Sequence, residues 1–268
     1  MKWTADVARG EWIAPRLAGR GVVGGTVPRG FEAYVRVFHP VDPYETTRAT
    51  WAQVTREYGT VWHAAMQWDS VYRGDPNRGC TRPQQGRLPV DLLALLSAPL
   101  ADASTTPELA TVGVWHGWGD LHPAGTGLLV ASGGDGDASA ARDRLLAELA
   151  ASVSPEVSIA ANLGPTLSLP DREYVLLDAD VREFVDAALV DSAGIGWHSG
   201  FGPSPNLLWP ADRAWFLATE IDFDSTIIGA SRALIDEILA TSTLESAEVD
   251  ADTSLAWDAD TINGVPER

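Results

Sequence analysis

Three carboxylates follow one another closely near residue 220 of this 268-residue chain. Glu220, Asp222 and Asp224 alternate with other residues in the segment from Trp215 to Asp224, which its pattern predicts to be a β-strand. Side chains two residues apart share one face of a strand, so the three carboxylates would form a row with roughly 7 Å between neighbours. Such a row can bind Mg²⁺ or Ca²⁺, supply a general base, or simply face water or pair with arginines.

Tryptophan and histidine side chains form a second group of candidates. Two histidines and an aspartate lie between residues 115 and 123, and these are residue types that bind zinc. The six-residue spacing of the histidines fits no regular ligand pattern, so a turn with tryptophans packed beneath it is the other interpretation. Tryptophan is abundant, and aromatic side chains in loops can line a pocket. The candidate pocket residues are Trp115, His116, Trp118, Asp120, His122, Trp197, His198, Trp209, Asp212 and Arg213.

The signatures of several enzyme classes are missing from the sequence. Cys80 is the only cysteine, which excludes an intrachain disulfide and a cysteine-rich zinc site. The glycines at 21–25 lack the lysine of a phosphate-binding loop, and no Gly-x-Ser-x-Gly motif is present. The sequence therefore predicts no cofactor and no metal, and it identifies no catalytic residue.

Charge is distributed unevenly along the chain. The formal net charge is −18, which argues against binding nucleic acid by phosphate neutralisation and against docking on an anionic membrane. Residues 1–100 carry 12 basic and 9 acidic side chains, whereas residues 171–268 carry 5 and 20. The acidic third is either a solvated surface with an acidic tail or a face that binds a basic protein or peptide.

Segment lengths and hydropathy give the expected location. The N-terminus has no apolar stretch typical of a secretory signal, and the longest apolar stretch, residues 90–101, is shorter than the roughly 20 residues of a membrane span. We expect a cytoplasmic protein, and no oligomeric state follows from the sequence.

The positions of helices and strands must bring these residues together. Further strands are predicted near residues 32–38, 111–118, 157–161 and 174–177, and helices near residues 48–58, 90–100, 138–151, 181–190 and 231–240. Thr47 is the expected cap of the first helix. The order has no regular βαβ rhythm, so we predict an α+β fold with a mixed or antiparallel sheet and several packed helices. Residues 1–242 would form one domain, with a division into subdomains near the glycine-rich segment 124–137, and residues 243–268 an acidic tail that adds little to the core.

Two long motifs resemble a known group of sequences. The segments Val27–Pro40 and Pro205–Thr226 are similar to a family of uncharacterised proteins from high-GC Gram-positive bacteria, and the similarity extends along most of the chain to Asp260–Asn263. That family has no established activity, so the resemblance implies membership without a function.

Two classes of function remain after these exclusions. The sequence favours a cytoplasmic, non-catalytic binding or protein-interaction protein with an acidic C-terminal face. The alternative is a metal-assisted, hydrolase-like enzyme that uses Glu220, Asp222 and Asp224.

Overall fold

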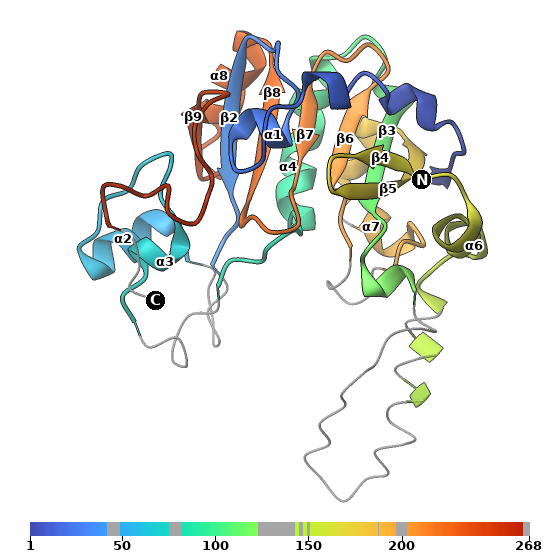
Figure 1. Ribbon diagram of the computed structural model, residues 1–268, viewed down its shortest axis with the longest axis horizontal. Coiled ribbons are helices and arrows are strands. Elements are labelled where there is room, and N and C mark those ends of the chain that lie inside the picture. The colour runs from blue at the N-terminus through green and yellow to red at the C-terminus, as the bar shows by residue number, and fades with distance from the viewer. Residues whose placement is uncertain are drawn as a thin grey trace, which may run out of the picture.

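An antiparallel sheet organises the molecule, which confirms the predicted α+β class (Figure 1). The computed structural model describes residues 1–41, 49–74, 82–122, 143–144, 147–148, 151–186, 188–196 and 203–264. The sheet that these residues form has nine strands in the order β1-β5-β3-β6-β7-β8-β2-β9, with β4 paired to β5. Every pairing is antiparallel. The strands are β1 (Lys2–Trp3), β2 (Ala33–Phe38), β3 (Ala110–Trp115), β4 (Leu167–Leu169), β5 (Arg172–Ala179), β6 (Leu207–Pro210), β7 (Phe216–Ala218), β8 (Ser225–Ala230) and β9 (Ser246–Val249).

Helices cover one face of this sheet, and the N-terminal segment covers the other (Figure 1). The α-helices are α1 (Val23–Thr26), α2 (Trp51–Tyr58), α3 (Trp68–Val71), α4 (Val90–Asp102), α6 (Pro155–Leu163), α7 (Ala188–Ser192) and α8 (Arg232–Ala240). The 3-10 helices are η1 (Val7–Gly10), η2 (Ala14–Arg16), η3 (Pro107–Leu109), η4 (Gly119–Leu121) and η6 (Val181–Val185). Among the described residues, no helix has both the length and the apolar character needed to cross a bilayer.

Alternation along the strands divides the core into two layers. In β2, Val35 and Val37 point into the layer beneath α4 and α8, whereas Tyr34 points into the layer beneath the N-terminal segment. Arg36 and Phe38 share the face of Tyr34 by the same alternation. The charged Arg36 therefore lies on the face of β2 that is covered by the N-terminal segment, and its counter-ion must come from that side of the sheet.

Local capping signals explain where several helices begin. Thr50 and Gln53 form a capping box at the start of α2, and Gly59 ends the helix with a φ of 67°. The helix therefore begins later than the predicted start at 48, and the predicted cap Thr47 lies outside the described residues. Ser231 caps α8 by accepting a hydrogen bond from the backbone N–H of Leu234.

Three of the predicted elements differ from the structure. The segment 157–161, predicted as a strand, belongs to α6, because Ser154 caps a helix whose first residue is Pro155. The strand predicted over 215–224 ends at Ala218, and a turn at 220–223 leads back into β8. The predicted helix over 181–190 is split into η6 and α7.

The described part of the predicted acidic tail, residues 243–264, is packed against the rest of the molecule. β9 pairs with β2, and Leu244, Val249 and Leu255 are buried. The Glu245 carboxylate accepts hydrogen bonds from the first two backbone N–H groups of α2. Our prediction that this segment adds little to the core is therefore wrong for the described residues up to 264.

Strands from both sides of the glycine-rich segment 124–137 belong to the same sheet. β3 precedes that segment in the chain and pairs with β5 and β6, which follow it. The segment 124–137 and most of the predicted helix 138–151 lie outside the described residues.

Candidate functional site

The turn between β7 and β8 separates the three carboxylates of the predicted row. Glu220 and Asp222 both accept hydrogen bonds from Arg172, which lies at the start of β5. The distances from Arg172 Nη2 are 2.7 Å to Glu220 Oε1 and 2.8 Å to Asp222 Oδ2. Asp224 points to a different partner, so the row that the strand pattern predicted does not exist. Of the three interpretations of these carboxylates, the geometry matches pairing with arginines.

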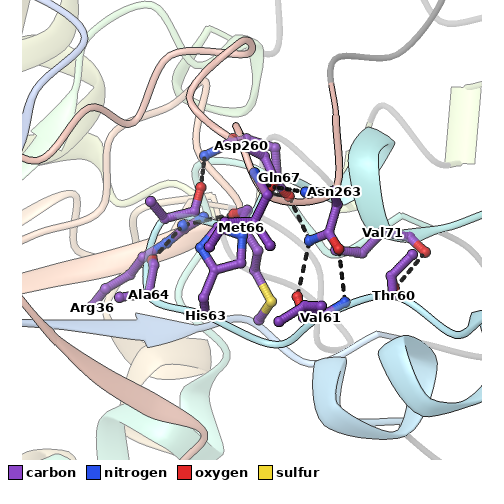
Figure 2. A network of polar contacts seen from close by, with 12 residues as sticks. Arg36, Thr60, Val61, His63, Ala64, Met66, Gln67, Val71, Asp260 and Asn263 are labelled. Atoms are coloured by element: carbon purple, nitrogen blue, oxygen red, sulfur yellow. Dashed lines mark hydrogen bonds and ion pairs between the residues drawn. The ribbon is translucent and has the colours of Figure 1, made fainter.

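Asp224 forms a buried ion pair with Arg36 of β2. Arg36 also donates to the backbone carbonyls of Ala64 and Met66 (Figure 2). With Ser225 Oγ and Asp224 as further acceptors, its guanidinium is surrounded by hydrogen-bond acceptors. Burial raises the pKa of Asp224 and lowers the pKa of Arg36, although their mutual attraction opposes both shifts. The pair is structural in its setting, because it fixes β2 and β8 to the loop before α3.

A second polar network lies beside the first and involves the C-terminal segment (Figure 2). The buried Asp260 carboxylate accepts hydrogen bonds from the backbone N–H groups of Gln67, Ile262 and Asn263, and it lies 2.9 Å from Nε2 of His63. Burial alone would raise the pKa of Asp260, but the hydrogen bonds from Asn263, His63 and Gln67 hold it below its usual value. Asn263 closes the network by exchanging two hydrogen bonds with the backbone of Val61.

A cavity of about 290 Å³ lies between the N-terminal segment and the sheet, next to the Arg172 ion pairs. Its walls are mainly apolar, and its polar side chains come from β5, from the turn after β7 and from the N-terminal segment. The lining residues are Leu17, Arg20, Gly21, Gly25, Thr26, Leu169, Pro170, Arg172, Tyr174, Leu207, Ala218, Glu220, Asp222 and Phe223. At Gly25 a side chain would overlap the backbone of Gly19, so glycine is required for this tight loop over the cavity.

Tyr174 is the unusual member of this lining. It is only 5% exposed, yet its hydroxyl forms no hydrogen bond with any residue that the structure describes. The hydroxyl oxygen is not itself fully buried, so it is accessible from the cavity and can donate a hydrogen bond to a molecule that enters there. Burial, assisted by the negative charge of Glu220, raises the pKa of Tyr174 well above its usual value. The group is therefore a permanent O–H donor that lines an apolar cavity.

The predicted cluster at 115–122 is a packed turn. Asn206, which is 1% exposed, accepts hydrogen bonds from the Trp115 backbone N–H and from Trp118 Nε1. The ring of His116 donates to the carbonyl of Ala161, and that of His122 donates to the carbonyl of His116.

A carboxylate also belongs to this turn. Asp120 pairs with Arg87 at 3.1 Å. The structure thus brings these five predicted residues together in one turn. The tryptophans Trp115 and Trp118 bond to Asn206, the histidines His116 and His122 to backbone carbonyls, and Asp120 to Arg87.

The other predicted pocket residues lie elsewhere. Trp209 and Arg213 line a separate cavity of about 620 Å³, together with the ion-paired Arg9 and Asp178. Burial alone would raise the pKa of Asp212, but hydrogen bonds from Thr105, Ala214 and Ser104 lower it. These contacts fix the loop before η3. Trp197 and His198 lie outside the described residues.

Metal-binding geometry is lacking in the described part of the chain. No three histidine, cysteine, aspartate or glutamate side chains there are grouped so that they could hold one ion. This applies to Glu220, Asp222 and Asp224 as well, because the first two bind Arg172 and the third binds Arg36.

Basic residues of the N-terminal part of the chain form ion pairs with acidic residues of the C-terminal part. In the described part of the chain, residues before 100 and residues after 170 are joined by four arginine–aspartate pairs and by one histidine–aspartate pair. They are Arg9–Asp178, Arg20–Asp171, Arg29–Asp252, Arg36–Asp224 and His63–Asp260. Five of the 20 acidic side chains in residues 171–268 therefore have a basic partner near the start of the same chain.

Comparisons with known proteins add no relative. Neither the models of protein families, nor the curated proteins, nor the solved structures include a match to this chain. Function must be argued from the geometry alone.

Sequence reasoning missed the residues that define the cavity. Arg172 and Tyr174 alternate on β5, and this alternation places them on one face, but nothing local indicates that Glu220 lies opposite them. Asn206 precedes β6 and looks like an ordinary loop residue in the sequence. Its position between Trp118 and the backbone of Thr219 becomes visible only in the folded chain.

Proposed function

We propose that this chain is a non-catalytic binding protein, and that its ligand is a small, largely apolar molecule held in the cavity beside Tyr174. The observation that carries the proposal is the hydroxyl of the buried Tyr174 side chain, a donor that lines this cavity and has no hydrogen-bond partner among the described residues. A ligand oxygen in the cavity can accept this hydrogen bond in place of water.

The size and lining of the cavity agree with a small ligand. Its volume of about 290 Å³ lies near the lower end of the range that is usual for small-molecule pockets. Such pockets are mostly apolar and have a few polar groups that orient the ligand. Leu17, Leu169 and Leu207 supply the apolar walls, and Tyr174 and Glu220 supply polar groups.

The alternatives have less support. An enzyme built on the carboxylate row would need three carboxylates that converge, and in this fold they point to two different arginines. A basic partner for the acidic third would compete with arginines that already pair with it. Cytoplasmic location and membership of the bacterial family remain proposals that rest on the sequence.

Blocking the cavity tests the proposal. We expect 2-indanol, a compact bicyclic alcohol, to bind the wild-type protein in an NMR titration and to shift resonances of residues around Tyr174. Leu17→Trp places a large ring in the cavity lining and should abolish these shifts. Leu163→Trp is the matched control, because Leu163 is 86% exposed on α6 and lines none of the cavities described above. Binding that survives Leu17→Trp would refute the proposed site.

A further inference from the structure

The polar groups of the cavity define the chemistry of the ligand. We propose that the cavity takes a compact apolar molecule with one neutral hydroxyl group, which lies between the Tyr174 hydroxyl and the Glu220 carboxylate. This inference rests on the proposed function, because it names the ligand class for the same cavity.

Tyr174 can donate a hydrogen bond to the ligand. Its pKa is raised by burial and by the charge of Glu220, so the hydroxyl keeps its proton at any physiological pH. An aromatic O–H of this kind donates one hydrogen bond, and no described residue accepts it. A ligand oxygen that enters the cavity can accept this bond.

Glu220 can accept a hydrogen bond from the ligand. Its Oε1 accepts both hydrogen bonds from Arg172, and its Oε2 contacts the backbone N–H of Ile221. Each carboxylate oxygen has two acceptor positions, so capacity for another donor remains. A hydroxyl group is both a donor and an acceptor, and one such group can therefore satisfy Glu220 and Tyr174 together.

Charge and hydrogen bonding together favour a neutral group over an ion. Arg172 is already paired with both Glu220 and Asp222, and Arg20 lies 3.4 Å from Asp171. These three carboxylates and two arginines leave one net negative charge, so a carboxylate ligand would lose its hydration without gaining a free positive charge. An ammonium group has three donors and no acceptor, so it cannot accept the hydrogen bond that Tyr174 donates.

Four probes with one carbon skeleton test the ligand class. They are indane, 2-indanol, 2-aminoindane and indane-2-carboxylate, each titrated by NMR into the wild type, Tyr174→Phe and Tyr34→Phe. We expect 2-indanol to bind most tightly to the wild type. Tyr174→Phe should weaken 2-indanol by roughly three- to tenfold, the equivalent of one net hydrogen bond, and leave indane unchanged. Tyr34→Phe is the control, because the Tyr34 hydroxyl is buried on the same sheet but bonds to Pro28 outside the cavity.

The outcomes separate the ligand class from the proposed function. Equal weakening of indane and 2-indanol by Tyr174→Phe, or tightest binding of the amine or the carboxylate, would overturn the hydroxyl assignment. The proposed function would survive that result if Leu17→Trp still blocks indane, and it would fail if no probe binds the wild type. Should Tyr174→Phe not fold, intermolecular NOEs from the carbinol proton of 2-indanol to the Tyr174 ring decide the question in the wild type, since their absence refutes the assignment.

Discussion

Arg36 and Asp224 lie 188 positions apart in the sequence and form an ion pair of 3.1 Å in which both residues are almost completely buried. Their relative exposures are 2% and 7%. Taking two charges out of water is costly, and the raised pKa of Asp224 and the lowered pKa of Arg36 have this cause. The other hydrogen bonds of Arg36, to Ser225 and to the carbonyls of Ala64 and Met66, offset part of that cost.

Removing one member of this pair should be far more damaging than removing an exposed ion pair. We expect Asp224→Ala to lower the free energy of unfolding by about 3–5 kcal/mol, because it leaves the Arg36 charge buried without a counter-ion. Asp222→Ala, which breaks a pair whose acid is exposed, should cost less than about 1 kcal/mol. Urea unfolding measures both, and equal losses would contradict this view of Arg36.

His39 should make stability depend on pH. It is fully buried, it donates from Nδ1 to the carbonyl of Gln84, and it accepts at Nε2 from Thr226. Burial lowers its pKa from 6.5 to about 4, so between these values the unfolded chain binds a proton that the folded protein does not. The contribution of His39 is therefore complete above pH 6.5 and falls by about 3 kcal/mol as the pH drops to 4.

A variant isolates this effect from other titrating groups. His39→Asn removes the imidazole, and its unfolding free energy should fall less steeply than that of the wild type between pH 6.5 and 4. Parallel profiles in urea unfolding would show that His39 does not titrate in this window.

Asp260 should hold the C-terminal segment on the loop before α3. Asp260→Ala would leave the backbone N–H groups of Gln67 and Asn263 without their acceptor, and we expect a loss of about 2–4 kcal/mol in unfolding free energy. Hydrogen exchange at these two amides should become faster. Asp258→Ala, an exposed change two positions earlier, is the control and should alter neither quantity. Unchanged exchange in Asp260→Ala would assign the anchoring to other contacts.

Elements with strong local signals were predictable from the sequence. The alternation of β2, the amphipathic pattern of α8 and the apolar pattern of α4 each indicate a structure that neighbouring residues decide. Prediction failed where contacts between distant segments override a local pattern. Residues 215–224 alternate like a strand, but the chain turns at 220–223 because the Glu220 and Asp222 carboxylates bind Arg172 and β8 pairs with β7.

The cavity was less predictable than the fold, for a related reason. Its chemistry depends on Tyr174 of β5, on Glu220 in the turn after β7, and on the N-terminal loop that covers both. The spacing of residues along the sequence predicts none of these contacts. For the C-terminal segment, the acidic composition led to a wrong prediction. Its charge suggests a solvated tail, but Glu245 and Asp260 accept hydrogen bonds from backbone N–H groups of the folded protein.

The position of β2 in the sheet has a consequence for the newly synthesised chain. Both strands that pair with β2 come from residues 225–249, so on the ribosome its two edges have no native partner until most of the protein has been made. The sequence Ala-Tyr-Val-Arg-Val-Phe would be prone to intermolecular pairing during that wait, and the charge of Arg36 at its centre opposes such association. Arg36, whose burial costs free energy in the folded protein, thus protects β2 from intermolecular pairing until its partner strands are synthesised. When β8 pairs with β2, Asp224 neutralises the charge of Arg36.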